Sequence, residues 1–388
     1  MFRSGAVLRR RADGEDLAVT NTELFFDLVY VFAITQLAGY LLDHLTGRGV
    51  VETAVLLLAV WWAWNYTAWA TNWVDPDHRA VRALLVVLMF ASLVMSAAIP
   101  GAFDDSAVGF AAAYVGLQVV RSAFMAASFR RGDRMSRNYS QLLAWSAIAG
   151  VGWLVGAFLP ADARLVVWIA ALVVDYAAPL HGFALPRWGR TPMSDWTLAG
   201  GHLAERMQLF VIIALGESIL AVGATFSAID HDWAVVGAFV IGFALNVLLW
   251  AIYFVRQAEE GAQALAAAAD PARAGRGGYT YAHVIMVAGI IVVAVAIDHT
   301  IVHPRGDLSV ATAAVTLAGP AIYLAGNILF NVLVTGHVPR SRLAGIAALG
   351  VLIPVAVVVS PLVLMLLATL VILTLAVTSG APRLRSSG

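Results

Sequence analysis

Two carboxylates lie one helical turn apart in the apolar stretch TNTELFFDLVYVFAITQLA, residues 20–38. Glu23 follows Thr20 by three residues, the spacing of a capping box, in which the glutamate helps to begin a helix and lies at its positive end. Asp27 lies one turn deeper, where a charge inside a bilayer is costly. Residues i and i+4 share a helical face. We therefore expect both acids to point into the protein, with Asp27 either paired with a cation or protonated.

The cation expected at the depth of Asp27 is Arg121, in the stretch LQVVRSAFM. Arg121 precedes Arg130 by nine residues, about 13 Å along a helix, so its side chain cannot reach the interface comfortably. The two helices would run in opposite directions, which brings Asp27 and Arg121 to similar depths. We predict an Asp27–Arg121 pair, with Arg206 as the alternative cation. A purely structural role for such a pair stays open.

A second charged stretch, GGHLAERMQLFVIIALGESILAVGATF, carries Glu205, Arg206 and Glu217. Arg206 and Glu217 share a helical face but lie about 16 Å apart along the axis. Glu217 falls near mid-membrane, where packing alone seldom explains a carboxylate, so we expect it to be protonated or linked to an ion. Gly216, beside it, would let another backbone approach closely.

Two more polar residues fall at mid-depth. In VVDYAAPLHGFALP, Pro179 cannot donate to the carbonyl of Asp175, so a broken helix would offer oxygens to an ion or substrate. An ordinary proline kink with a hydrogen-bonded Asp175 is the alternative. In WWAWNYTAWATNWVDPD, Asn65 would either line a pocket or, as we favour, pack between helices.

His299 and His303 have the i,i+4 spacing that can bind one metal ion. A third ligand would have to come from another loop, so we favour ordinary loop polarity at these histidines. We predict no metal site and no cofactor.

These residues belong to a chain of 388 residues that is 61% hydrophobic and 12% charged, with a mean hydropathy of +0.83. Soluble domains are about half apolar and a quarter charged, so the composition predicts an all-α integral membrane protein with the lipid bilayer as its surroundings. The absence of cysteine excludes disulfides and thiolate chemistry. No basic domain with interleaved aromatic residues indicates nucleic-acid binding. The oligomeric state stays open.

Twelve apolar segments are long enough to cross a bilayer, which takes about 20 residues. They lie near 22–45, 51–73, 80–99, 107–128, 139–159, 163–185, 203–226, 233–256, 281–302, 310–335, 342–359 and 361–379. The last two share one apolar run, which we divide at Ser360-Pro361. The connection 257–280 is expected to extend the eighth span before a flexible turn at GRGG. We treat residues 1–388 as a single transmembrane domain, with tandem halves over 20–186 and 200–379 as a hypothesis.

Arginine supplies all 24 basic residues and is distributed unevenly. Nineteen arginines fall in the termini and the even-numbered loops, whereas the odd-numbered loops hold Arg48, Arg164 and Arg305. Cytoplasmic loops are enriched in basic residues, so both termini are predicted in the cytoplasm. No cleavable signal peptide is predicted.

Three stretches, TELFFDLVYVFAITQLA, WWAW…TNW and HLAERMQLFVIIALGESIL, together resemble the bacterial low temperature requirement protein A (LtrA) family. The resemblance spans almost the whole chain. It implies an integral membrane protein of the bacterial inner membrane, named for a cold-growth phenotype. It also carries the family's motif acids onto Glu23, Asp27, Glu205 and Glu217, with Arg206 beside them. It implies no reaction.

Acids and arginines inside several spans favour a transporter or channel-like permease for an unidentified small solute or ion, with proton coupling as the finer hypothesis. A membrane sensor or scaffold linked to cold growth would act without flux and is the alternative. A membrane-embedded enzyme with clustered outer His and Asp ligands is the second alternative. In the opening stretch we expect Glu23 to serve mainly as a cap, and the loss of Asp27 to cost more stability.

Overall fold

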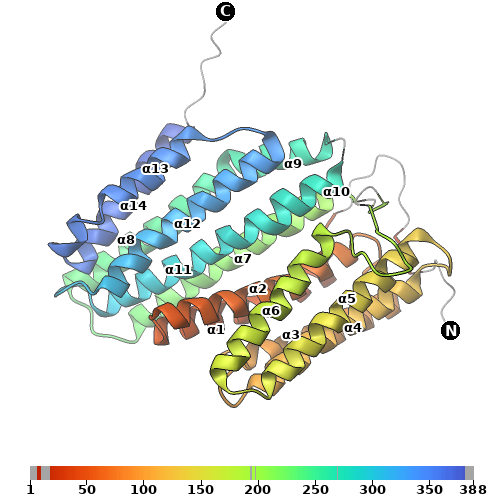
Figure 1. The fold of residues 1–388 in the computed structure, drawn as a ribbon. Helices are drawn as coiled ribbons and strands as arrows, with labels where there is room; N and C mark the ends of the chain where they lie inside the picture. The colour runs from red at the N-terminus through yellow and green to blue at the C-terminus, as the bar shows by residue number, and fades with distance from the viewer. Residues whose placement is uncertain (1–6, 10–17, 193–194, 197, 269, 381–388) are drawn as a thin grey trace, which may run out of the picture. The chain divides into compact units, whose positions relative to one another are not determined.

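The computed structural model describes residues 7–9, 18–192, 195–196, 198–268 and 270–380. Its helices follow one another along the chain (Figure 1). The first seven are α1 (Asn21–Asp43), α2 (Gly47–Ala70), α3 (Arg79–Ala97), α4 (Ala107–Ser128), α5 (Arg134–Ala157), α6 (Ala161–Leu180) and α7 (Gly200–Ser227). The others are α8 (Trp233–Ile252), η2 (Tyr253–Gln257), α9 (Ala258–Ala266), α10 (Pro271–Ala274), η3 (Gly275–Ala282), α11 (His283–Val302), α12 (Val310–Thr335), α13 (Arg340–Val351), η4 (Val355–Val357) and α14 (Pro361–Gly380).

The predicted capping box begins α1. The Glu23 N–H donates to Thr20 Oγ1 at 3.3 Å, and the Thr20 N–H donates to Glu23 Oε2 at 3.0 Å. Similar local chemistry bounds α12, where Ser309 Oγ accepts from the Thr312 N–H at 3.0 Å and Gly336 ends the helix with a φ of 73°. Glycine adopts that left-handed conformation without a steric penalty. These helix limits therefore follow from residues next to one another in the sequence.

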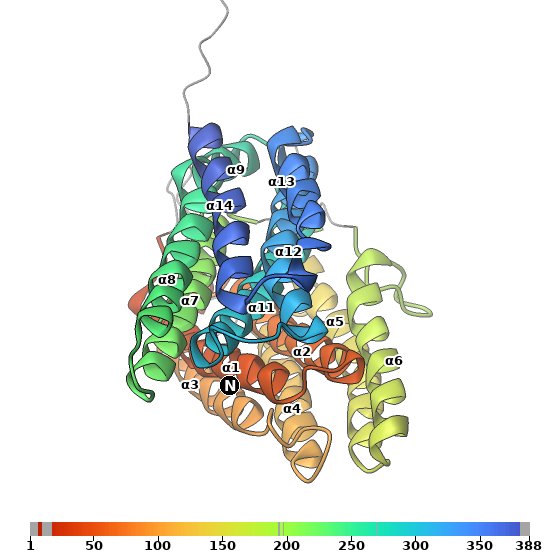
Figure 2. The same ribbon diagram turned by 90° about the vertical axis from the view of Figure 1, so that its left-hand side faces the viewer.

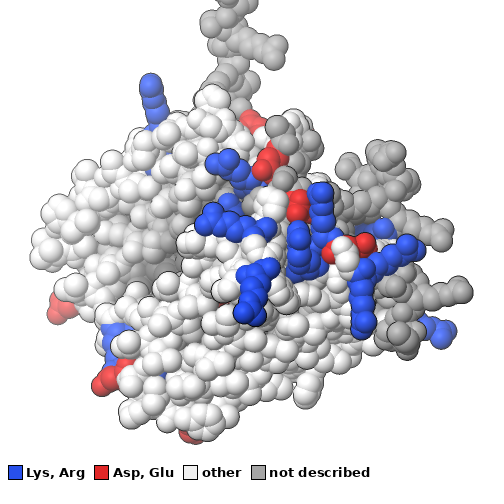
Figure 3. All heavy atoms as spheres, turned by 45° about the vertical axis from the view of Figure 1, so that its right-hand side comes forward, with Lys and Arg blue, Asp and Glu red and all other residues white. Residues whose placement is uncertain are grey.

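Eleven of the twelve predicted spans overlap one long helix each, whereas the span 342–359 covers the shorter α13 and η4. This pattern confirms an all-α polytopic membrane protein. Among the described residues, eleven helices are long and apolar enough to cross a membrane. The predicted second span is α2, which has 24 residues and is not one of the eleven. Its tryptophans, Glu52 and Asn65 dilute its aliphatic content. Because most of its side chains are buried, α2 needs less apolar surface. Most of the molecular face in Figure 3 is uncharged, as expected for helices embedded in lipid.

The connection after α8 is partly as expected. The helix continues through η2 and α9 to Ala266, but the GRGG sequence lies in the π-helix η3, so the predicted flexible turn is wrong. Close packing explains the difference: a Cβ on Gly278 would lie 2.2 Å from Val334 Cγ2. The glycines thus allow a close helix contact. The division at Ser360-Pro361 is confirmed, because α14 begins at Pro361.

The chain forms two compact units, Met1–Arg206 with Ala269–Gly275, and Met207–Ala268 with Arg276–Gly388. In unit 1, α4 packs against α2, α3 and α5, while α1 packs against α2 and α3. In unit 2, α11 packs against α8 and α12, and α14 packs against α8, α12 and α13 (Figure 2). The boundary falls inside α7 after Arg206, and the tandem-repeat hypothesis stays a prediction.

Glycines bring α11 and α12 into backbone contact. A Cβ on Gly289 of α11 would lie 2.5 Å from the main-chain nitrogen of Tyr323 on α12. A Cβ on Gly319 would lie 2.9 Å from the nitrogen of Val293. Small residues are how membrane helices approach one another closely, because lipid supplies no hydrophobic drive for their association. Glycine therefore allows the backbones of α11 and α12 to lie against each other.

Candidate functional site

Glu23 is the centre of a buried ion-pair network in unit 1. Its Oε2 accepts from Arg9 Nη2 at 2.9 Å and from the Thr20 N–H at 3.0 Å. Its Oε1 lies 2.9 Å from His202 Nε2 and 3.2 Å from Arg206 Nη1. The Glu23 side chain is completely buried. Glu23 caps α1 as expected, and the same carboxylate also joins α1 to the start of α7 and to the segment before α1.

Asp27 shares the Arg206 guanidinium with Glu23. Arg206 Nη2 donates to Asp27 Oδ1, and Trp64 Nε1 donates to the same oxygen at 2.7 Å. Asp27 Oδ2 and Arg206 Nε are buried and have no hydrogen-bond partner among the described residues. The predicted Asp27–Arg121 pair is wrong. The expected depth in the membrane could not distinguish Arg121 from Arg206. Arg206 lies near the start of α7 and Arg121 near the end of α4, and both of these helix ends are predicted on the same side of the membrane.

His202 and Asn72 connect this network to the main chain just before α7. The Asn72 amide exchanges two hydrogen bonds with the main chain of Ala199, at 2.8 and 3.0 Å. Asn72 Nδ2 also lies 3.3 Å from His202 Nδ1. The contacts with Asn72 and Glu23 favour the neutral tautomer that carries its hydrogen on Nε2 and donates it to Glu23, and Arg9 Nη2 also lies 3.3 Å from that nitrogen. With a neutral imidazole, two guanidinium groups and two carboxylates, the network has no net charge.

A second buried network in unit 1 connects α4, α5 and α6. Asp175 Oδ2 accepts from Tyr114 Oη at 2.8 Å and from Trp153 Nε1 at 3.1 Å. Gln118 Nε2 donates to Tyr114 Oη at 3.0 Å, and Arg121 Nη2 donates to Gln118 Oε1. A continuous chain of hydrogen-bonded side chains thus runs from Asp175 to Arg121.

The two networks meet the same face of α2. Arg121 Nη1 donates to the Ala63 carbonyl at 3.2 Å and to Thr67 Oγ1 at 3.4 Å. Arg206 Nη1 donates to Thr71 Oγ1 at 3.3 Å. Thr67 and Thr71 are four residues apart and share a helical face. The two arginines therefore attach to successive turns of one helix.

Asp175 is held in a regular helix. The α-helix is unbroken over Ala161–Leu180, and Pro179 lies in its last turn. The predicted broken helix at Asp175 is therefore wrong, because the proline comes too late to open the middle of the span. The donors Tyr114 and Trp153 satisfy the carboxylate instead, as the alternative interpretation had it.

Glu205 and Asn65 occupy different surroundings. Glu205 is exposed, and its Oε2 accepts from the Val19 N–H at 3.2 Å, just before α1 begins. This hydrogen bond fixes the main chain just before α1. Because Glu205 is exposed, it does not belong to a buried path. Asn65 is buried in α2, next to the Trp64 that donates to Asp27.

Glu217 belongs to unit 2, where it is buried in α7. A Cβ on the neighbouring Gly216 would meet no neighbouring atom within 4 Å. The predicted close approach of a second backbone at Gly216 is thus wrong. The glycine instead lines a pocket between α7 and α8.

His299 and His303 lie side by side at the end of α11, with ring centroids 5.0 Å apart. His299 Nε2 lies 3.3 Å from Thr312 Oγ1. The neighbouring Asp298 accepts from Thr225 Oγ1. In the described part of the chain, no group of three or more histidine, aspartate or glutamate side chains is placed to hold a metal ion. The histidine pair therefore has no third ligand there.

Comparison with known proteins places the chain in a family. The family model described as bacterial low temperature requirement A protein (LtrA) matches residues 18–377. The chain belongs to the LtrA family. An uncharacterized protein of Rhizobium meliloti (strain 1021) is 36% identical over 345 residues, which cover 88% of this chain and 83% of that protein. No solved structure matches the chain. The LtrA match includes Glu23, Asp27 and Arg206, whereas Arg9 precedes it.

Five members of the Glu23 network were not expected from the sequence: Arg9, Trp64, Thr71, Asn72 and His202. A local signal existed for His202, which precedes Arg206 by four residues and so lies on the same face of α7. Trp64 precedes Asn65, and for both the sequence left a pocket lining or interhelical packing open, but not a hydrogen bond to Asp27. Arg9 lies before the first helix, and no spacing rule connects it to Glu23.

Proposed function

We propose that this LtrA-family chain is a proton-linked permease for a small solute or ion, located in the bacterial inner membrane with both termini in the cytoplasm. The buried, charge-balanced network of Glu23, Asp27 and Arg206 is the main support. Replacing a buried ion pair by packed apolar residues is often neutral or stabilising. Charged groups inside a lipid-embedded bundle are therefore expensive, and they typically mark ion and substrate paths.

The position of the two networks suggests what they do. Asp27 is six residues from the first residue of α1, and Arg121 is seven residues from the last residue of α4, about 10 Å in each case. The arginine distribution predicts that these helix ends face the cytoplasm. The ion pairs would then close the cytoplasmic half of a polar path.

Asp27 is the group we propose to take up the proton. Its Oδ2 is buried without a hydrogen-bond partner among the described residues, so a proton could bind there without displacing a donor. Protonation would remove the charge that faces Arg206 and leave Glu23 as the anion of that pair. The attachment of α1 to the start of α7 would weaken, and the cytoplasmic side would open.

The test measures electrical currents from purified protein in liposomes on a solid-supported membrane. Jumps in pH are combined with a panel of inorganic cations, inorganic anions, amino acids and sugars. We expect a current for at least one solute class that depends on pH. Asp27→Asn mimics the protonated acid and should remove the pH dependence. Glu52→Gln is the matched control, because Glu52 lies in the same unit and pairs with the half-exposed Arg48.

Two results would overturn the proposal. One is a current no larger than that of protein-free liposomes for every solute and pH jump. The other is an Asp27→Asn protein with the full pH dependence of the unmodified chain. A chain that supports growth at low temperature without any flux would favour the sensor or scaffold alternative.

A further inference from the structure

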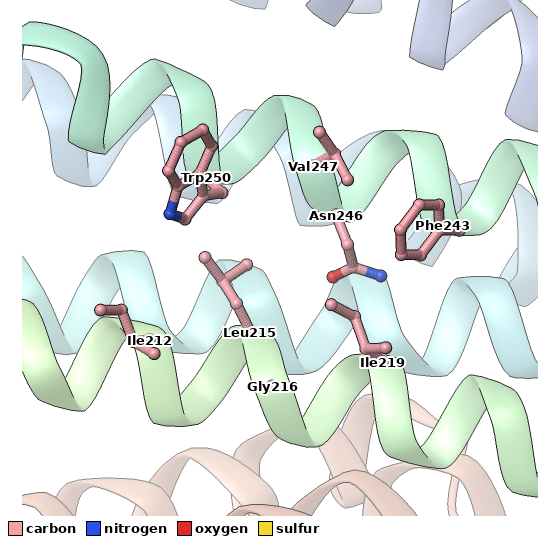
Figure 4. A pocket seen from close by; sticks show the side chains of 8 residues that line it. All are labelled: Ile212, Leu215, Gly216, Ile219, Phe243, Asn246, Val247 and Trp250. Carbon is pink, nitrogen blue, oxygen red and sulfur yellow. The ribbon is translucent and has the colours of Figure 1, made fainter.

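A pocket lies between α7 and α8 within unit 2. It has a volume of about 230 Å³ and is lined by Ile212, Leu215, Gly216, Ile219, Phe243, Asn246, Val247 and Trp250. Figure 4 shows these residues on the two helices, with the side chains of Asn246, Leu215 and Ile219 in the space between them. Ile212, Phe243 and Trp250 are each nearly half exposed, so the pocket is open to the surroundings of the helices. Apart from the indole nitrogen of Trp250, its walls are hydrocarbon except at one residue.

Asn246 is that residue. It is 1% exposed, and its Nδ2 donates to the Gly242 carbonyl of its own helix at 3.2 Å. Its Oδ1 is buried and has no hydrogen-bond partner among the described residues. A buried acceptor without a donor costs free energy, and in a membrane no water restores it. A ligand that brought one donor into this apolar pocket would satisfy the carbonyl.

We propose that this pocket binds a membrane-dissolved, apolar small molecule that carries a single hydroxyl or N–H donor for Asn246 Oδ1. The size follows from the volume, since an apolar cavity of about 150 Å³ holds a benzene ring. The larger pocket therefore admits a fused bicyclic molecule. The site lies near the middle of α7, and on the other side the chain stays helical past the end of α8 through η2 and α9, so its ligand arrives through the hydrocarbon layer. The proposal does not depend on the permease function.

Gly216 offers a way to fill the pocket without disturbing the packing around it. A Cβ at Gly216 meets no neighbouring atom within 4 Å, and the same is true of Gly223, two turns later on α7. Only Gly216 lines the pocket. Gly216→Leu should occupy the binding space, while Gly223→Leu adds the same side chain to the same helix outside it. The two variants together test whether a leucine side chain inside the pocket prevents the ligand from binding.

The experiment measures binding of radiolabelled 2-naphthol to the full chain in lipid nanodiscs, with protein-free nanodiscs as background. The matched probe is 2-methoxynaphthalene, which keeps the bicyclic body and lacks the donor. We expect saturable binding of one 2-naphthol per chain, favoured over the ether by roughly fivefold, the value of one net hydrogen bond. Gly216→Leu should abolish saturable binding, and Gly223→Leu should retain it.

Asn246→Leu is a second, independent variant that keeps side-chain size and removes the acceptor. It should bind the ether as before and lose the fivefold preference for 2-naphthol, and this test stands even if Gly216→Leu does not fold. Three results would refute the site: partition no greater than in empty nanodiscs, saturable binding by folded Gly216→Leu, or a preference for 2-naphthol that survives in Asn246→Leu. Equal binding of both probes by the unmodified chain would also refute it, because the groove would then accept any lipid tail.

Discussion

Replacing Glu23 by glutamine should destabilise the chain more than replacing Asp27 by asparagine. Glu23 accepts from Arg9 and His202 and pairs with Arg206, so Glu23→Gln leaves the almost fully buried Arg9 side chain without its carboxylate. The order is the reverse of the one that the sequence suggested, because the structure gives Glu23 more charged partners than a helix cap needs.

The expected loss in unfolding free energy depends on which charged and hydrogen-bonding groups each substitution leaves without a partner. Removing one member of a buried ion pair typically costs about 3–5 kcal/mol, which we expect for Glu23→Gln. Asp27→Asn keeps an oxygen for Trp64 Nε1, and Arg206 keeps Glu23. The loss is then about 1.5–3 kcal/mol, the value of hydrogen bonds to a charged group.

The assay is equilibrium unfolding of the purified chain by titration of mixed micelles with SDS. Glu52→Gln is the control: Glu52 is also buried, but its cation Arg48 is half exposed, so its loss should cost about 1 kcal/mol or less. Adding Arg9→Gln to Glu23→Gln should recover part of the lost stability, because no guanidinium is then stranded at that position. The reasoning fails if Glu23→Gln costs no more than Glu52→Gln, or if Asp27→Asn is the most damaging of the three.

Three further predictions follow from other parts of the chain. Gly289→Ala should cost about 1–3 kcal/mol, since its Cβ would meet the backbone of α12, whereas Gly350→Ala has no neighbour to meet and should be neutral in the same titration. Asp232 caps α8, and the N–H of Val235 donates to its carboxylate and lowers its pKa. The contribution of this hydrogen bond to the stability of the fold is present above the ordinary aspartate pKa and is lost as the pH falls through the lower pKa of the folded state. Asp232→Asn should therefore have a flatter stability profile between pH 5 and pH 2, and an unchanged profile would argue against the cap. A reporter fused after residue 388, beyond the described residues, should be active only in the cytoplasm, and a periplasmic signal would contradict the predicted orientation.

Local chemistry in the sequence determined where the helices lie and where several begin. Apolar length identified the spans, and the Thr20–Glu23 spacing identified the start of α1, because hydropathy and caps depend on neighbouring residues alone. The same local reasoning showed that Glu23 and Asp27 share a face. It went wrong at GRGG, since the preference of glycine for turns was outweighed by close packing of η3 against Val334 on α12.

Only the tertiary structure decided which groups those acids meet. Asp27 had two arginines within its depth range, and the one it contacts, Arg206, is 179 residues away in the chain. Depth in the membrane follows from position along a helix, which the sequence contains. The direction in which each helix turns its side chains toward its neighbours follows from packing between helices, and that packing placed Arg206 beside Asp27 and directed Arg121 to Gln118 and Thr67.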